Sequence, residues 1–367
     1  MRTSWLEVDL GAIERNVECL RRRYGPGTEV MSVVKANAYG HGLVEASKAC
    51  ERGRASGLAV AILEEGATLR DAGVALPILL LGLALPEQAP DIVRYGLEAV
   101  VSDSGLCEAL SRAAVSQCRE AVVHLKVDTG MCRVGVEPPE VLKLAQRISS
   151  LPGLRLAALS THFTSADTDP EAVREETRLF DQAARTLASA GFGDLKQHLA
   201  ASAAGELHPS TRRQMVRAGL LTYGVPPRPG APLDGLTPAL QWKARITQVR
   251  RAAPGATVSY GRTHTLTRDS LLGLLPVGYA DGWPRSLSGR GTVLVGGGRA
   301  PVLGRVCMDQ CVVDLTGLGP VAVGDEAVLL GIQGDQCQTV DHVAAQAGTI
   351  AHEILSRLGA RLHRVYA

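Results

Sequence analysis

A lysine with the sequence context of a covalent catalyst follows the first clearly apolar run of the chain. Lys35 comes directly after Val33 and Val34 and is followed by a glycine-rich segment, residues 36–42. A lysine in this position is partly removed from water, which favours its neutral amine and lowers its pKa toward the range that a Schiff-base nucleophile needs. A lysine that extends its amine back to solvent has the same local sequence. The segment alone leaves both roles open.

Alternating charges mark a second segment. The apolar run at residues 122–127 contains Lys126 near its end, and Asp128 and Arg133 follow it. If that run is a strand buried on both faces, its charges must be paired or functional. The rigid guanidinium of Arg133 suits a carboxylate or a phenolate oxygen, and an ion pair with Asp128 is the structural alternative.

The elements that must position these residues are repeated strand–helix units. Short apolar runs alternate with amphipathic helical patterns between residues 30 and 222, as in repeated βα units around a parallel sheet. The runs are residues 30–34, 58–61, 78–81, 98–101, 122–127, 155–159, 196–199 and 215–220. Eight such runs in series predict an α/β fold with a closed, TIM-type (β/α)8 barrel, whose active site lies at the C-terminal ends of the strands.

The last three barrel strands end at further polar residues. His162 follows the sixth run, His198 lies near the end of the seventh, and Arg217 lies in the eighth. Barrels of this type often bind phosphate at the loops after strands seven and eight, so the Ser202 hydroxyl and the amides of Gly219 and Leu220 are candidate phosphate ligands. The two histidines lack a third His, Asp or Glu at ligand spacing, so we predict no metal.

The pattern changes after Gly224, where prolines crowd residues 226–232 and disfavour both helix and central strand. Beyond this linker, runs at residues 240–250, 270–277, 292–295 and 302–314 predict strands separated by glycine turns. We therefore expect a barrel domain over residues 1–230 and a mainly β domain over residues 231–367.

Composition excludes several classes of partner. The 39 basic and 37 acidic residues give a net charge of +2, so nothing in the charge favours nucleic acid or an anionic membrane. The eight cysteines form no CxxC pair, so we expect reduced thiols. No apolar run reaches the roughly eighteen residues of a membrane span, and the N-terminus lacks a signal-peptide pattern. A cytoplasmic protein is expected.

Six segments, taken in order along nearly the whole chain, resemble those of the alanine racemase family. They are residues 34–42, 126–135, 161–163, 217–224, 259–261 and 304–310. The resemblance implies an N-terminal (β/α)8 barrel with a C-terminal β domain, and a head-to-tail homodimer with shared active sites. It also implies pyridoxal 5′-phosphate as the cofactor, attached to Lys35, and a small amino acid as the substrate.

The resemblance further implies two bases on opposite faces of the substrate, Lys35 and Tyr260 of the partner subunit. Arg217 matches the arginine that hydrogen-bonds the pyridine nitrogen, supported by His162. Arg133 matches the arginine that faces the phenolic oxygen and the substrate carboxylate, steadied by Lys126, which is carbamylated in some relatives.

Other residues correspond to the cofactor and substrate shells of the family. The phosphate shell is matched by Tyr39, Ser202, Gly219, Leu220 and the position of His352. Met308 and Asp309 of the partner subunit match substrate-binding residues. The residues that match the corridor through which substrate reaches the site are Asp167, Tyr279, Arg285 and Arg305.

Three positions depart from the family pattern. His352 stands where a tyrosine is usual, Ala201 where an asparagine is common, and Cys132 where a glycine is usual. Imidazole is smaller than phenol and charges near neutral pH, so His352 could admit a larger substrate such as serine. Cys132 constrains a backbone that glycine would leave free.

The expected activity is interconversion of L- and D-alanine, supplying D-alanine for the cell wall in a bacterial source. One alternative is a racemase of the same family that prefers serine or another small amino acid. Another is a protein that binds pyridoxal phosphate without turnover, against which Tyr260 argues, because a carrier needs no opposite-face base. A decarboxylase of related architecture lacks its cysteine and aspartate partners here.

Overall fold

The computed structural model describes residues 3–232 and 234–367. The chain divides into two compact units. The barrel unit comprises Ala12–Ala38 and Leu43–Thr237, and the β unit comprises the segment through Gly11, Tyr39–Gly42 and Pro238–Ala367. Each unit is described by itself below.

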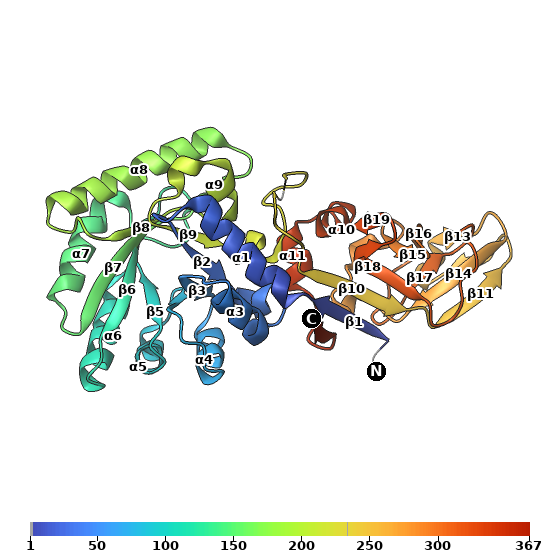
Figure 1. The fold of residues 1–367 in the computed structure, drawn as a ribbon, viewed down its shortest axis with the longest axis horizontal. Helices are drawn as coiled ribbons and strands as arrows, with labels where there is room; N and C mark the ends of the chain where they lie inside the picture. Colours follow the sequence, from blue (N-terminus) through green and yellow to red (C-terminus); the bar gives the residue numbers. More distant parts are fainter. Residues whose placement is uncertain (1–2, 233) are drawn as a thin grey trace. The chain divides into compact units, whose positions relative to one another are not determined.

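In the described part of the barrel unit, eight parallel strands follow one another in the order β8-β7-β6-β5-β4-β3-β2-β9 (Figure 1). The bridge between Ala201 and Arg217 closes β8 onto β9, and the amide of Arg217 donates to the carbonyl of Ala200 at 3.0 Å. The strands are β2 (Glu29–Val33), β3 (Gly57–Val60), β4 (Ile78–Leu80), β5 (Glu98–Val101), β6 (Ala121–Lys126), β7 (Leu154–Ser160), β8 (Lys196–His198) and β9 (Met215–Ala218). The predicted barrel is confirmed.

Helices connect the strands and cover the outside of the barrel (Figure 1). They are α1 (Leu10–Tyr24), α3 (Leu43–Arg52), α4 (Leu63–Asp71), α5 (Ala89–Arg94), α6 (Ser104–Ser116), α7 (Val141–Ser150), α8 (Pro170–Ser189) and α9 (Ser202–Leu207). The segment α2 (Lys35–Tyr39) is instead a short left-handed turn after β2. The starts of the helices follow from the sequence: Asp169 caps α8 by accepting from the amides of Glu171 and Ala172, and Pro170 fills the first helical position.

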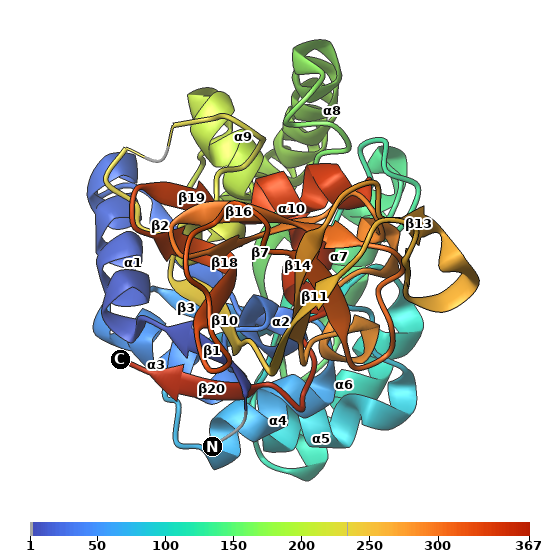
Figure 2. The same cartoon turned by 90° about the vertical axis from the view of Figure 1, so that its right-hand side faces the viewer.

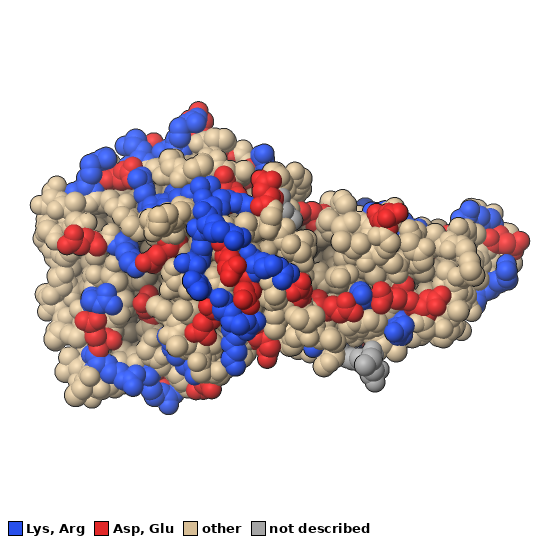
Figure 3. Space-filling view, in the orientation of Figure 1, with Lys and Arg blue, Asp and Glu red and all other residues tan. Residues whose placement is uncertain are grey.

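Basic and acidic side chains are interspersed on the outside of the barrel unit, as Figure 3 shows for one face. Exposed ion pairs join neighbouring elements, for example Arg52 of α3 to Glu14 of α1 at 2.9 Å. Such exposed pairs contribute about 0–1 kcal/mol each. The stability of the unit therefore comes from its apolar strands and helix faces.

The β unit is built on a mostly antiparallel sheet with the order β11-β14-β17-β16-β15-β18-β10-β1-β20, in which only β1 and β20 of the described strands pair in parallel; Figure 2 shows β18, β10, β1 and β20. Its strands are β1 (Ser4–Val8), β10 (Leu240–Arg245), β11 (Gln248–Ala252), β14 (Ser270–Leu275), β15 (Thr292–Val295), β16 (Gly298–Leu303), β17 (Cys311–Asp314), β18 (Glu326–Gln333) and β20 (His363–Tyr366). Beside it lie the strand β19 (Gln336–Gln338), the hairpin of β12 (Thr257–Val258) and β13 (His264–Thr265), and the helices α10 (Val340–Ala347) and α11 (Ala351–Ser356). The expected mainly β C-terminal part is confirmed.

The core of the β unit includes two tryptophans in edge-to-face contact. The rings of Trp242 and Trp283 are 5.7 Å apart at 86° and fully buried. A second apolar cluster packs the hairpin against the sheet through Val258, Leu266, Leu272 and Leu303. These contacts give the turns of the β unit a rigid base.

Candidate active site

Lys35 opens a turn of left-handed backbone. Ala36, Asn37, Ala38 and Tyr39 have φ values of 54°, 55°, 53° and 51°. A left-handed helical conformation costs an L-residue roughly 1–2 kcal/mol, so four in a row persist only where the surroundings hold them. Strain of this kind is concentrated at ligand-binding and catalytic sites. The turn directly follows β2, at the C-terminal end of the barrel strand.

Glu65 of α4 holds the start of this turn. Its carboxylate accepts from the amide of Ala36 at 2.6 Å and from the amide of Ala61 at 2.8 Å. At the other end, Asn37 turns its side-chain oxygen to the amide of Leu43 at 2.8 Å. The amides of Ala36 and Leu43 at the two ends of the turn are thereby bonded to side chains, and the amide of Ala38 donates to the carbonyl of Val34 at 2.8 Å.

The glycines after the turn are required by close packing in the β unit. A Cβ on Gly40 would lie 2.5 Å from the carbonyl oxygen of Leu355, and a Cβ on Gly42 would collide with the hydroxyl of Tyr366. Arg364 donates to the carbonyl of Gly40 at 2.8 Å. The glycine-rich segment thus lets the backbone approach its neighbours.

Tyr39 and His352 lie together in the β unit. Their rings are 6.0 Å apart at 52°. Tyr39 is buried, and burial raises the pKa of its phenol to about 12, so the phenol keeps its proton and can donate to an anion. The structure therefore places the unusual His352 beside a phosphate-shell candidate.

Four cationic side chains gather at the C-terminal ends of β2, β6 and β9: Lys35, Lys126, Arg133 and Arg217. Burial lowers the pKa of Lys35, and the charges of Arg133 and Arg217 lower it further, against the opposing carboxylate of Glu65. Burial also lowers the pKa of Lys126 well below its ordinary value, again assisted by Arg217 and Arg133. Such a cluster suits a ligand with several negative charges.

Arg217 is held rigidly inside the barrel. It is 4% exposed, and burial lowers the pKa of its guanidinium to about 10. One terminal nitrogen donates to Nδ1 and the carbonyl of His198 at 2.7 and 2.6 Å. The other donates to the carbonyls of Thr161 and Leu199 at 2.8 and 2.9 Å and to Nδ1 of His162 at 3.2 Å. These bonds use the terminal N–H groups and leave Nε–H as the donor for a ligand.

His162 is neutral in this environment. Burial lowers the pKa of its imidazole well below the ordinary value, and the charge of Arg217 adds to the effect. Because Nδ1 accepts from Arg217, the ring proton is on Nε2. A small cavity is lined by His162, Lys126, Arg133 and Thr161, which brings these sequence-predicted residues around one space.

The loop that carries Arg133 is ordered through its backbone. Asp128 accepts from the amide of Gly130 at 2.9 Å and from the amide of Arg133 at 3.0 Å. No side-chain ion pair joins Asp128 to Arg133 among the described residues, so the guanidinium of Arg133 is not committed to that carboxylate. Cys132 has a φ of 51°, in the region where glycine is free of strain.

An anion-binding corner lies after β8 and β9. The hydroxyl of the buried Ser202 accepts from the amide of Gly219 at 2.9 Å. The hydroxyl proton of Ser202 is therefore directed elsewhere, and Leu220 begins the short 3-10 helix η4 (Leu220–Tyr223), whose first amides lack intrahelical partners. A hydroxyl and an amide at one corner are a suitable pair of phosphate donors.

The remaining sequence-predicted residues lie elsewhere. Asp167 is in the loop between β7 and α8. Tyr260, Met308 and Tyr279 are in the β unit and exposed, at 71%, 53% and 43%. Asp309 of the same unit pairs with Arg361 at 2.8 Å, and Arg285 begins the 3-10 helix η7 (Arg285–Leu287).

The β unit gives its candidate base a defined backbone. Ser259, just before Tyr260, has a φ of 65° and donates its hydroxyl to the carbonyl of Arg305 at 2.6 Å. Arg361 also donates in bidentate fashion to the buried carboxylate of Asp281, at 2.7 and 3.0 Å. One arginine therefore fixes both Asp281 and Asp309.

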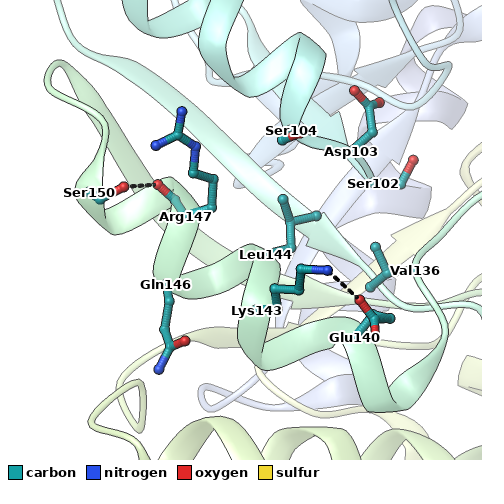
Figure 4. A pocket seen from close by; sticks show the side chains of 10 residues that line it. All are labelled: Ser102, Asp103, Ser104, Val136, Glu140, Lys143, Leu144, Gln146, Arg147 and Ser150. Atoms are coloured by element: carbon teal, nitrogen blue, oxygen red, sulfur yellow. Dashed lines mark hydrogen bonds and ion pairs between the residues drawn. The ribbon is translucent and has the colours of Figure 1, made fainter.

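A wider pocket on the barrel unit is separate from these residues. It lies between α7 and the loop before α6, and Figure 4 shows Lys143 turned to Glu140 of the same segment. Its charged side chains are engaged in surface pairs, including Lys143 with Glu140 at 3.4 Å and Arg147 with Glu108 at 2.7 Å. None of the candidate site residues lines it.

Two features of the described residues concern metal ions and membranes. Among residues 3–232 and 234–367, no group of three or more His, Cys, Asp or Glu side chains has the arrangement of a metal site. No helix in the part of the chain that the structure describes is long and apolar enough to cross a membrane.

Sequence reasoning missed Glu65 and Arg361. Glu65 lies in the helix after β3, and only its place beyond the C-terminal end of a barrel strand could have suggested a role. Arg361 is near the end of the chain, more than fifty residues from Asp309. No local pattern announces a contact at that separation.

Comparison with known proteins gives the chain a family. Residues 8–227 match the family model for the N-terminal domain of alanine racemase, and residues 239–366 match that for its C-terminal domain. An alanine racemase of Symbiobacterium thermophilum is 42% identical over 369 residues, covering 100% of this chain and 97% of the relative.

Solved structures agree with the sequence relatives. The alanine racemase of the D-cycloserine producer Streptomyces lavendulae superimposes with a TM-score of 0.95 at 35% identity, covering 100% of this chain and 97% of that one. The alanine racemase of Bartonella henselae, with covalently bound pyridoxal phosphate, has a TM-score of 0.89 at 27% identity and full coverage of both chains. The chain belongs to the alanine racemase family and is an amino-acid racemase.

Proposed function

We propose that this racemase interconverts L- and D-alanine with pyridoxal 5′-phosphate on Lys35, using Lys35 and Tyr260 of the partner subunit as the two bases. The observation that carries the proposal is the gathering of Lys35, Lys126, Arg133 and Arg217, with the pKa of Lys35 lowered by burial and by the neighbouring arginines. An amine so perturbed is suited to covalent and base chemistry.

The residues present fit this cofactor. Pyridoxal phosphate carries a phosphate and a phenolate oxygen, and the cluster of cations provides their counter-charges. Ser202 and the amide of Leu220 are the phosphate donors that the corner after β9 offers, with Gly219 bonded to Ser202. In the β unit, the protonated phenol of Tyr39, with His352 beside it, is a further candidate phosphate donor. The relative from Bartonella henselae, with the cofactor covalently bound, supports the assignment.

When bound, the cofactor supplies an electron sink that acidifies the Cα proton of the amino acid. Arg217 limits this effect, because its Nε–H can donate to the pyridine nitrogen while the guanidinium keeps its proton. His162 and the three carbonyls around Arg217 hold the guanidinium in place. The pyridine nitrogen would then gain no proton from Arg217, which discourages delocalisation of the negative charge of the substrate onto that nitrogen.

Arg133 orients the substrate by binding its carboxylate, and the amine of Lys126 lies beside it in the same cavity. From the partner subunit, Met308 and Asp309 complete the pocket. Arg361 fixes Asp309 in each chain at 2.8 Å. The reacting Cα is thus presented in one orientation, which proton transfer at two faces requires.

The two bases act on opposite faces of Cα. Lys35 takes or returns the proton of the D-isomer, and Tyr260 of the partner subunit that of the L-isomer. Tyr260 is 71% exposed in the single chain, which suits a residue supplied to a second subunit. A head-to-tail homodimer then provides two shared sites, with Asp167, Tyr279, Arg285 and Arg305 along the substrate corridor.

A serine-preferring racemase is the second candidate, favoured by the place of His352 beside Tyr39. An imidazole occupies less space there than the usual phenol and so leaves room for a hydroxymethyl side chain. For either substrate, we propose the cytoplasm as the location. For alanine, we propose cell-wall synthesis as the use of the D-isomer.

The test is racemisation in deuterium oxide by the purified protein with added pyridoxal phosphate, followed by chiral chromatography. We expect L-alanine to invert faster than L-serine and to gain deuterium at Cα. Faster inversion of serine would replace the substrate. Absorbance of a lysine-bound cofactor without inversion of either amino acid would replace the enzyme by a binding protein.

A further inference from the structure

A line of hydrogen bonds crosses the inside of the barrel from Arg217 to a carboxylate. Arg217 contacts Nδ1 of His198 at 2.7 Å, Nε2 of His198 contacts Nδ1 of His124 at 2.9 Å, and Nε2 of His124 lies 3.1 Å from the carboxylate of Glu98. His198 and His124 are 1% and 3% exposed, and their rings meet edge to face at 5.0 Å. All four residues belong to the barrel unit.

The line runs from one end of the barrel toward the other. Glu98 is the first residue of β5, whereas His198 is the last residue of β8. Because the strands are parallel, Glu98 lies at the end opposite to the one where catalytic residues gather. The Glu98 side chain is 20% exposed, so this end of the line meets solvent.

Every bond in the line has a fixed direction. An arginine only donates, so Nδ1 of His198 must accept and the proton of a neutral His198 is on Nε2. His198 then donates to Nδ1 of His124, which places the proton of His124 on Nε2 and directs it to the Glu98 carboxylate. Adding a proton to either imidazole would oppose two donors and break the line. Burial accordingly lowers the pKa of His198 well below its ordinary value.

The line also connects the guanidinium of Arg217 to the carboxylate of Glu98. No ion pair joins Arg217 to a carboxylate within the described ranges, and its charged neighbours at the site are Lys35, Lys126 and Arg133. A buried cation without a counter-charge is costly. The two polarisable imidazoles place the carboxylate of Glu98 at the end of a continuous path to the guanidinium.

We propose that Glu98, His124 and His198 form a relay that orients Arg217 and supplies its counter-charge from the opposite end of the barrel. Glu98 is then a positioning residue for racemisation, since it acts on the cofactor only through Arg217. The catalytic part of this inference rests on the proposed function above. The orientation and protonation of the relay do not.

Other charged groups near the relay also affect the charge of Glu98. The charges of Arg155 of β7 and Lys196 of β8 lower the pKa of Glu98. The charge of Glu98 in turn acts to raise the pKa of Arg70 of α4. Burial alone would raise the pKa of Glu98, but the hydrogen bond from His124 and the charges of Arg155 and Lys196 hold it below its ordinary value. Glu98 therefore carries its charge at neutral pH.

Glu98→Gln is the sharpest variant, because its amide oxygen still accepts from His124 while the charge is gone. Glu120→Gln is the matched control: Glu120 pairs with Arg155, a neighbour of Glu98, at 2.7 Å and touches no relay residue. In the holoenzyme of Glu98→Gln, we expect the visible absorbance of the Lys35-bound cofactor to titrate at lower pH, because Arg217 is less compensated. We expect kcat to fall roughly tenfold with a smaller change in KM, a size typical of losing an outer partner. Glu120→Gln should leave both unchanged.

Nitrogen NMR of the histidine-labelled wild-type holoenzyme tests the relay without any substitution. We expect the ring proton of both His198 and His124 on Nε2, as the hydrogen-bond directions along the line require. A proton on Nδ1 of either ring, or a charged ring, would overturn the proposal, as would a Glu98→Gln enzyme that matches Glu120→Gln in absorbance and kcat. If the wild type shows the expected protons and Glu98→Gln shows the absorbance shift, but the wild type racemises nothing, the relay stands and the proposed function fails.

Discussion

The clamp by Glu65 offers a direct way to perturb the Lys35 turn. In Glu65→Gln, the amide oxygen can accept from only one of the amides of Ala36 and Ala61, and the new NH2 group opposes the other. A hydrogen bond to a charged group contributes about 1.5–3 kcal/mol, so one bond of that size is lost. The left-handed backbone after Lys35 costs roughly 1–2 kcal/mol per residue, and the loss removes part of what offsets it.

The assay is hydrogen exchange of the peptide that contains Lys35, together with kcat/KM for alanine. A loss of about 1.5–3 kcal/mol in local stability raises exchange at the affected amide roughly 10- to 150-fold, since about 1.4 kcal/mol corresponds to a factor of ten. We expect kcat/KM to fall as well, because Lys35 is less firmly placed. The control is Glu64→Gln, one residue away and exposed. If Glu65→Gln exchanges and turns over like Glu64→Gln, the clamp is not what holds the turn.

Three further changes have expected outcomes. Arg217→Lys loses the fork that reaches His198, His162 and three carbonyls, so we expect pyridoxal phosphate to bind at least about tenfold more weakly in a fluorescence titration. His352→Tyr refills the space beside Tyr39, so the ratio of kcat/KM for serine to that for alanine should fall. Lowering the pH from about 7 to 5 should reduce the free energy of unfolding in urea: His162 and His198 have lowered pKa values and stay neutral when folded, whereas the unfolded chain binds protons below about pH 6.5.

A specific result would contradict each of these three predictions. Unchanged cofactor affinity in Arg217→Lys would show that a point charge suffices at that position, and Arg213→Lys, at the outer pair with Asp181, is its control. A serine preference that survives His352→Tyr would move the cause elsewhere. Stability that stays level in the barrel unit down to about pH 5 would contradict neutral, buried imidazoles.

The barrel could be predicted because its strands are buried on both faces. Such strands are continuous apolar runs rather than alternating ones, and β5 was predicted with the bounds that the structure shows, Glu98–Val101. The β unit was predicted less well. The run at residues 240–250 is two strands, β10 and β11, and β1 was not identified because its partners lie far away, as in the pairing of Ser4 with Ala244.

The site was only partly visible in the sequence. Lys35 could be singled out as a lysine between an apolar run and a glycine-rich loop, but nothing in the sequence Ala36 to Tyr39 predicts left-handed backbone, because none of these residues is glycine. That conformation depends on Glu65 and on close packing around Gly40. His124 and Glu98 looked like ordinary strand residues, since only the closed barrel brings four strands' side chains into one line.

The most direct test of the shared two-base site mixes two inactive enzymes. Lys35→Ala and Tyr260→Phe homodimers are each expected to lack activity, because every site is missing one base. After dissociation and reassociation, a hybrid dimer has one site with both Lys35 and Tyr260 of the partner subunit, and one with neither. Random mixing should then restore about a quarter of the wild-type activity. No recovery, with hybrid dimers present by mass spectrometry, would contradict a site completed by the second subunit.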